Sequence, residues 1–363
     1  MKGPVRLGTS TAILVAGLLS LAYLLGMAIL PPAPSAALRA EMTAAADLMA
    51  RAENAIKSCR EGRGVPIDPS ADPNGTGLIG VERSAITTSA GRLEAKRTTT
   101  NPAFAGLVVW LLHEAGVRRD DVVAVGASSS FPALIVATLA AARVAGAEPL
   151  VISSLGSSEW GANVPEFPWP AMEDCLRTAG ILDVDPIARS IGGEDDDGND
   201  MDPSGRSLLA SVIRAGGDVP FLEEPGLERN VARRLALYRE KAGRRPIKAF
   251  VNIGGGWADM GTDPEVLRLA PGLARRVAVP PPSRRGVIQT MAAAGVPIIH
   301  LLNVRGLCER YGLPWDPRPL PRPAEGPLYR RAPAALGPGL LSAVYVVLVL
   351  AVLVLGRRRL PAA

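Results

Sequence analysis

The sequence has few of the residues that most often carry catalysis or bind metals. It holds three cysteines and two histidines among 363 residues, and the cysteines form no Cys-x-x-Cys pair. Three thiols allow one disulfide at most and leave one thiol over, which excludes a disulfide-rich scaffold. His113 and His300 are too few for a histidine-rich metal site, so we expect each to be a packed or capping residue, although histidine is easily recruited for proton transfer.

The central part of the chain also lacks an excess of either charge. Two apolar runs lie near the ends of the chain. The short tails beyond these runs hold five of the 40 Lys and Arg residues (Lys2, Arg6 and 357–359) and no acidic residue. Removing them leaves 35 basic residues against 35 acidic ones. A balanced surface argues against a general binding surface for a polyanion, so we expect no nucleic-acid partner.

A long, uncharged and strongly apolar run lies near each end of the chain. Ser10–Leu30 is long enough to cross a bilayer as a helix, and Leu340–Leu355 reaches that length when it is extended back through Ala334–Gly339. A cleaved signal peptide is the alternative for the first run, but its apolar core exceeds the ~7–15 residues usual there and Pro31 and Pro32 follow it. The flanking basic residues predict that both tails are cytoplasmic.

These features predict a protein of the cytoplasmic membrane with two spans, both termini cytoplasmic and the main domain extracytoplasmic. A proline-rich stretch before the second run is expected to be an extended stalk. The expected parts are a cytoplasmic tail (1–9), a transmembrane helix (10–30), a juxtamembrane helix and loop (31–80), an α/β domain (81–313), the stalk (314–335), a second transmembrane helix (336–355) and a basic cytoplasmic tail (356–363).

The clearest structural signal is Asp121–Gly146. Val122–Val125 is a short β-branched run typical of a buried strand, and the small, hydroxylated residues of 126–131 follow it as a loop. Pro132 suits the first position of a helix, which continues over 133–144. This pattern predicts a strand–loop–helix unit of a parallel sheet.

The remaining pattern extends this unit into a larger sheet. Strands are expected at 84–88, 149–153, 247–253 and 296–302, and 92–96 could be a strand or a turn. Helical segments separate most of these strands. The expected fold class is therefore α/β, with a mostly parallel sheet, helices on both faces and two flanking transmembrane helices.

Polar loops follow several of the expected strands. Loops 126–131, 153–163, 252–259 and 302–305 should converge, because parallel strands end at the same edge of a sheet. Free N–H groups at a helix start favour an anion there, and Lys96 could hold a carboxylate. The alternative is that the serines only cap a helix and the threonines form a turn. The expected ligand-binding residues are Lys96, Thr98, Thr99, Ser128, Ser129, Ser130, Ser157, Ser158, Asn163, Asn252, Gly254, Gly255 and Asp259.

The same loop permits a catalytic interpretation. Ser128 or Ser129 would be the nucleophile, with Lys96 as base if its pKa is depressed. The stretch GASSS lacks the last glycine of a Gly-x-Ser-x-Gly elbow, because Ser130 stands there. This incomplete motif favours binding over catalysis. The glycines at 254–256 do not form a Gly-x-Gly-x-x-Gly motif, so no cofactor is evident.

An acidic loop at 192–206 is the only candidate for a metal site. It matches a calcium loop at Asp195 and Asp197, but Gly193 stands where the first acidic ligand is needed. The EF-hand interpretation therefore fails. A looser Ca²⁺ or Mg²⁺ site that uses Asp195, Asp197 and Asp200 stays open beside a solvated acidic loop.

Five ordered blocks of the chain resemble one known family. The blocks are GRLEAKRTTTNPAFAGLVVWLL (91–112), VAVGASSSFPAL (123–134), SSLGSSEWGANVPEF (153–167), GGEDDDGNDMDPSGR (192–206) and IKAFVNIGGGWADMG (247–261). Together they resemble the bacterial poly-gamma-glutamate system protein family, over most of the chain between the apolar runs. This resemblance implies a part in the synthesis and export of poly-γ-glutamate, an anionic amide-linked polymer. It implies a process rather than a reaction, so no residue roles are carried over.

Two functions follow as expectations. The first is a membrane-anchored component whose outer α/β domain binds poly-γ-glutamate or its synthase and export proteins. The second is an enzyme, a hydrolase or transferase, that acts on the γ-amide through the Ser-rich loop. A weaker resemblance to sugar-isomerase domains, over 121–154, would imply a sugar-phosphate ligand, and the expected location outside the cytoplasm argues against it.

Overall fold

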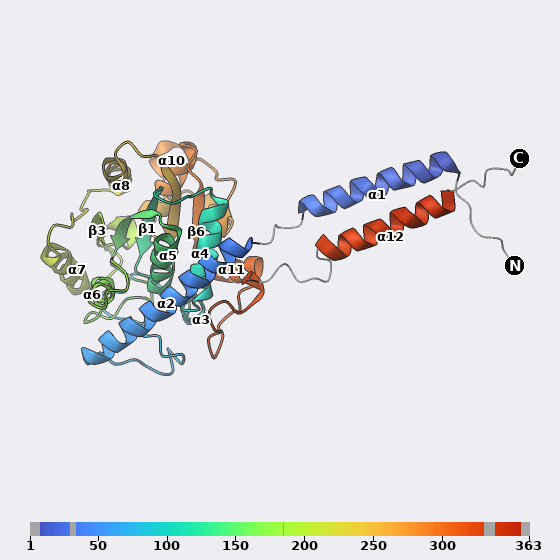
Figure 1. Ribbon diagram of the computed structural model, residues 1–363. Coiled ribbons are helices and arrows are strands. Elements are labelled where there is room, and N and C mark those ends of the chain that lie inside the picture. Colours follow the sequence, from blue (N-terminus) through green and yellow to red (C-terminus); the bar gives the residue numbers. More distant parts are fainter. Residues whose placement is uncertain (1–7, 30–33, 184, 330–337, 357–363) are drawn as a thin grey trace, which may run out of the picture. The chain divides into compact units, whose positions relative to one another are not determined.

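A computed structural model describes residues 8–29, 34–183, 185–329 and 338–356 (Figure 1). Its contacts divide the chain into two units. One unit covers Ala36–Leu328, and the other combines the two ends of the chain.

A six-stranded sheet in the order β3-β2-β1-β4-β6-β5 lies at the centre of the Ala36–Leu328 unit (Figure 1). Every neighbouring pair is parallel except β5 and β6, which are antiparallel. The mostly parallel α/β sheet expected from the sequence is therefore confirmed. The strands are β1 (Val122–Ser128), β2 (Glu148–Ser154), β3 (Ala188–Ser190), β4 (Ile247–Ile253), β5 (Gly272–Ala274) and β6 (Ile298–Leu301).

Helices cover both faces of this sheet, which explains the continuous apolar runs in its central strands. Every residue of β1 is buried. On one face α4 (Ala103–Glu114) and α5 (Pro132–Ala145) pack beneath α2 (Ala36–Gly62) (Figure 1). On the other face α8 (Leu227–Ala242) and α10 (Val287–Ala293) join the core that includes Val122 and Phe250. The remaining helices of this unit are α3 (Leu93–Thr99), α6 (Trp169–Thr178), α7 (Pro203–Ala215), α9 (Trp257–Met260) and α11 (Val304–Tyr311).

The structure differs from the expected elements before β1. Residues 84–88 form a turn, because the Thr87 hydroxyl accepts a hydrogen bond from the Ser84 backbone N–H at 2.9 Å. A single bridge between Thr87 and Ser157 is its only sheet-like pairing among the described residues. Residues 93–96 form the first part of helix α3, with Arg92 as its N-cap, and not a strand or a turn. The short antiparallel strand β5 was not expected at all.

The proline-rich segment also differs from an extended stalk over its first part. Asp316 accepts hydrogen bonds from two nitrogens of Arg97, each at 2.7 Å, and its backbone N–H donates to the Thr98 hydroxyl at 2.9 Å. These contacts fasten this part of the segment to α3. The part at 330–337 lies outside the described residues.

The unit at the chain ends pairs α1 (Thr9–Ile29) with α12 (Pro338–Gly356). The hydroxyls of Ser20 and Tyr345 lie 2.9 Å apart, and the rings of Tyr23 and Tyr345 stack with centroids 4.5 Å apart. Judged on the described residues, none of the helices combines the length and the apolar character needed to cross a membrane. The expected basic tails, with Lys2, Arg6 and 357–359, lie outside those residues.

One disulfide links α2 to α6, between Cys59 and Cys175, whose Cα atoms are 5.9 Å apart. Cys308 is a buried free thiol. This matches the limit of one bridge set by three cysteines. The bridge closes a long loop, since 116 positions separate its two residues, and long loops gain most from a crosslink in the chain-entropy model.

We predict that reduction of this disulfide lowers the free energy of unfolding by about 2–4 kcal/mol, because the unfolded chain regains freedom. Urea unfolding of the purified protein with and without a reducing agent measures the effect. The double variant Cys59→Ser/Cys175→Ser is the control, since it should match the reduced protein and not respond to the reducing agent. A wild-type protein that keeps its full stability after reduction would contradict the prediction.

Candidate functional site

A cavity of about 460 Å³ opens at the carboxyl edge of the sheet. It lies where the strand order reverses, between β1, which continues to β2 and β3, and β4, which continues to β6. Ligands of open α/β sheets bind in such crevices. All four loops that the sequence placed together contribute to its wall, through Ser130, Ser158, Gly255 and Asn303 among others.

Lys96, at the base of this cavity, is the least solvated cation in its wall, with 3% of its surface exposed. Its Nζ donates hydrogen bonds to the Ser130 carbonyl and, at 2.7 Å, to Ser158 Oγ. The same nitrogen lies 3.8 Å from the centre of the Phe131 ring. Burial lowers the pKa of Lys96 to about 7, although the charge of Glu159 opposes the shift. The amine can therefore gain or lose a proton near neutral pH.

Ser128, Ser130 and Ser158 add three hydroxyls to the cavity wall beside Lys96. Ser128 Oγ donates to Ser130 Oγ at 3.0 Å, and Ser130 Oγ also accepts from the Ser158 backbone N–H at 3.0 Å. The loops after β1 and β2 are joined in this way. Gly254 packs against this group with a φ of 81°, and a Cβ there would lie 2.9 Å from the Ser128 Cβ. A glycine is required there because its backbone approaches so closely.

The outer wall of the cavity combines aromatic and basic side chains. The Arg305 guanidinium lies 4.4 Å from the centre of the Trp315 ring, and Trp257 is 38% exposed. Arg92 also lines the cavity, so the described wall holds three basic side chains and one acidic side chain, Asp200. Trp257 and Arg305 lie in two of the loops that the sequence placed at this edge, 252–259 and 302–305, but neither was named among the expected ligand-binding residues. Arg92 and Trp315 were missed altogether.

Several expected ligand-binding residues lie outside the cavity wall. The hydroxyls of Thr98 and Thr99 donate to carbonyls of their own helix, at 2.6 and 2.7 Å. Ser157 Oγ donates to the Ser158 carbonyl, and Asn163 donates to the Val81 carbonyl at 2.7 Å. These side chains hold the loops in place, so the structure corrects the expectation that they face a ligand.

Ser129 requires the same correction. Its side chain is fully buried, its hydroxyl has no hydrogen-bond partner among the described residues, and it does not line the cavity. A nucleophile must reach the substrate, so Ser129 is excluded from that role in this geometry. The serine beside Lys96 is Ser158, which the sequence placed among the ligand-binding residues only.

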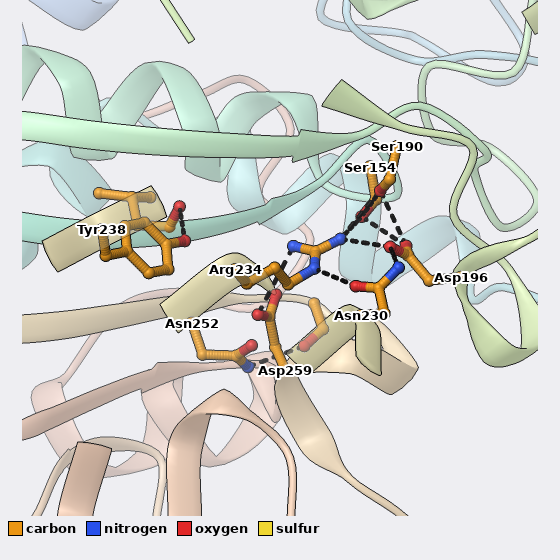
Figure 2. A network of polar contacts seen from close by, with 10 residues as sticks. Ser154, Ser190, Asp196, Asn230, Arg234, Tyr238, Asn252 and Asp259 are labelled. Atoms are coloured by element: carbon orange, nitrogen blue, oxygen red, sulfur yellow. Dashed lines mark hydrogen bonds and ion pairs between the residues drawn. The ribbon is translucent and has the colours of Figure 1, made fainter. Parts of the chain in front are cut away.

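Beneath the cavity, Arg234 of α8 is fully buried in a polar network (Figure 2). Its Nη2 donates to Asp196 Oδ2 at 2.6 Å and to the hydroxyls of Ser154 and Ser190 at 3.0 and 2.8 Å. Burial alone would lower the pKa of Arg234, but the charges of Asp196 and Asp259 outweigh it and raise the pKa. Ser154 also lines the cavity, so this network supports the cavity floor.

Asp259, expected to bind a ligand, belongs to this network and does not line the cavity. Its Oδ1 lies 3.8 Å from Arg234 Nη1 (Figure 2). Burial raises the pKa of Asp259 to about 6, and the attraction of Arg234 only partly offsets this. The carboxylate rests against β1 at Gly126, where a Cβ would lie 2.3 Å from Oδ2. Any side chain at Gly126 would therefore displace Asp259.

The acidic loop carries no metal cluster in this geometry. Among the described residues, no group of three or more His, Cys, Asp or Glu side chains could hold an ion. Asp197 accepts both hydrogen bonds from Asn199, and Asp200 faces the cavity. Asp195 has a φ of 51° and precedes Asp196, which turns inward to Arg234. The loop thus supplies a buried counter-ion, a role that the sequence analysis missed.

The Asn252 side chain contacts other residues of the unit and does not line the cavity. Its Nδ2 donates to the Gly254 carbonyl at 2.9 Å and contacts His300 Nδ1 at 3.0 Å. His300 is 2% exposed, and burial lowers its pKa to about 4. Because Asn252 presents a donor, the neutral imidazole accepts at Nδ1, and a proton added there would face another N–H. The packed role expected for His300 is confirmed.

We predict that His300 makes the folding stability depend on acid. The folded-state pKa lies below the ordinary value near 6.5, so the neutral ring stabilises the fold fully above that value, and this contribution is lost as the pH falls toward about 4. The difference is worth about 3 kcal/mol. Denaturant unfolding of wild type and of His300→Gln, each at about pH 4 and above pH 6.5, measures this loss of stability. Equal losses of stability in the two proteins would contradict the prediction.

In comparisons with protein-family models, with curated proteins and with solved structures, nothing matches this chain. The resemblance to the poly-gamma-glutamate system proteins therefore rests on the sequence blocks alone.

Proposed function

We propose that the α/β unit binds poly-γ-glutamate in this cavity, as a component of the synthesis or export of that polymer. The observation that carries the proposal is the buried amine of Lys96, which opens into a cavity whose wall also holds Arg92 and Arg305. A partly desolvated cation among hydroxyl donors is a site for a carboxylate.

The chemistry of the polymer fits the two parts of the wall. Each γ-linked residue offers one carboxylate, which Lys96 and the arginines can pair. The methylene groups between the amides are apolar and suit the faces of Trp257 and Trp315. A volume of about 460 Å³ lies in the range of small-molecule sites, so the cavity holds a short stretch or an end of the chain.

We also propose that α1 and α12 anchor this unit on the outer face of a membrane. Both helices carry no charged residue, and their apolar side chains are exposed, Leu14 at 64% and Val347 at 65%. The Cys59–Cys175 disulfide supports an oxidising compartment for the α/β unit. The basic residues beyond both helices support cytoplasmic tails.

Labelling of intact cells with a membrane-impermeant maleimide tests this topology. The variant Ser70→Cys places a thiol on an exposed position of the loop after α2, and it should react without permeabilisation. A cysteine appended after Ala363 should react only after permeabilisation. The unaltered protein is the control, because Cys308 is buried. The reverse pattern would refute the anchored, tails-inside arrangement.

Titration calorimetry with a short γ-linked glutamate oligomer tests the binding proposal. Lys96→Met and Arg305→Ala should each weaken binding by about tenfold or more, since a charge-assisted hydrogen bond contributes about 1.5–3 kcal/mol. Added salt should weaken wild-type binding as well. Lys248→Met is the matched control, because Lys248 is exposed near the amino end of β4, away from the cavity. Equal affinity of all four proteins would contradict the proposal.

A further inference from the structure

We propose that the same cavity catalyses acyl transfer, with Ser158 as the nucleophile and the Lys96 amine as its base. This inference rests on the proposed function for the identity of the amide substrate. The pairing of nucleophile and base rests on geometry alone, and it can be tested without the polymer.

The contact between the two residues has the geometry of an activated nucleophile. Lys96 Nζ lies 2.7 Å from Ser158 Oγ, within the 2.6–3.2 Å expected for a nucleophile and its base. Both side chains line the cavity, so a bound carbonyl can reach the hydroxyl. Lys96 is held by the Ser130 carbonyl on its other side, which fixes the amine toward Ser158.

The surroundings of Lys96 favour an amine that accepts protons. Among the described residues, no carboxylate lies within ion-pair distance of its Nζ, whereas a lysine with only a structural role normally pairs with one. The ring of Phe131 and nearly complete burial take the place of a counter-ion. With a pKa of about 7, a large share of this amine is neutral at neutral pH.

Ser130 completes the arrangement. Its Oγ accepts from the Ser128 hydroxyl and from the Ser158 N–H, and its own hydroxyl hydrogen has no acceptor among the described residues. Ser130 lines the cavity beside Ser158. Its hydroxyl is therefore available to donate to the negative oxygen that forms when a carbonyl is attacked.

The reaction balances without a metal, an oxidant or a nucleotide. Ser158 Oγ attacks the amide carbonyl carbon while its proton passes to Lys96 Nζ. The C–N bond then breaks, and the leaving amine takes that proton from Lys96, which leaves an acyl ester on Ser158. Water, or the amino group of another chain, attacks the ester; its proton passes to Lys96 and then to Ser158 Oγ. The products are a shortened chain or a transferred one.

The test uses the full-length protein in detergent with a fluorophosphonate probe, which reacts with activated serines and needs no knowledge of the polymer. Mass spectrometry should find the label on Ser158, and the labelling rate should rise with pH with a midpoint near 7, as Lys96 loses its proton. Ser158→Ala and Lys96→Met should label at least 100-fold more slowly. Ser211→Ala and Lys248→Met alter exposed residues away from the cavity and should label like wild type.

The Lys96→Arg variant distinguishes loss of the base from loss of the fold. It keeps a positive charge at the site but cannot act as a base near neutral pH. A folded Lys96→Arg protein, checked by its thermal transition, should remain unlabelled. Labelling that proceeds equally in Lys96→Arg and wild type would overturn the inference.

A second measurement separates this inference from the proposed function. The length of γ-glutamate oligomers is followed during incubation, beside their binding. Labelling of Ser158 without any binding of the oligomer supports the nucleophile and refutes the proposed polymer. Tight oligomer binding with no labelling of Ser158 and no change in length overturns the catalytic inference and leaves the binding function standing.

Discussion

The buried ion pair between Arg234 and Asp196 is the constraint on which the cavity depends. One guanidinium in α8 holds the acidic loop, the ends of β2 and β3, and α9 through Asp259. Removing one partner of such a pair leaves an uncompensated buried charge, which typically costs about 3–5 kcal/mol. Because Ser154 belongs to both this network and the cavity wall, loss of the pair would disturb that wall.

Arg234 and Lys96, two of the buried cations of the unit, have different sets of partners. Arg234 has two carboxylates, two hydroxyls and an amide as partners, and its charge is fixed at every physiological pH. Lys96 has one carbonyl, one hydroxyl and an aromatic ring as partners, and it opens into the cavity. The contacts of Arg234 hold the surrounding loops and strands in place. The Lys96 amine, in contrast, can release and accept a proton.

The two central strands could be located from the sequence, because β1 and β4 are short, mostly apolar runs, and small or polar residues follow at the point where each ends. The convergence of the four loops followed from parallel topology. Other features have no local signature: β5 has three residues, and Arg234 lies in a helix whose other charges face solvent. The choice of Ser158 over Ser129 also depends on which hydroxyl meets Lys96, and this is a tertiary contact between residues 62 positions apart.

The contacts of Asp316 have a mechanical consequence. Arg97 and Thr98, which bind Asp316, directly follow Lys96 in α3, and the neighbouring Trp315 carries Arg305 on its ring. The chain at Trp315 and Asp316 is thus fastened to the same short helix that carries Lys96. A displacement of these two residues would therefore shift α3, with Lys96, and the Trp315 ring in the cavity wall together.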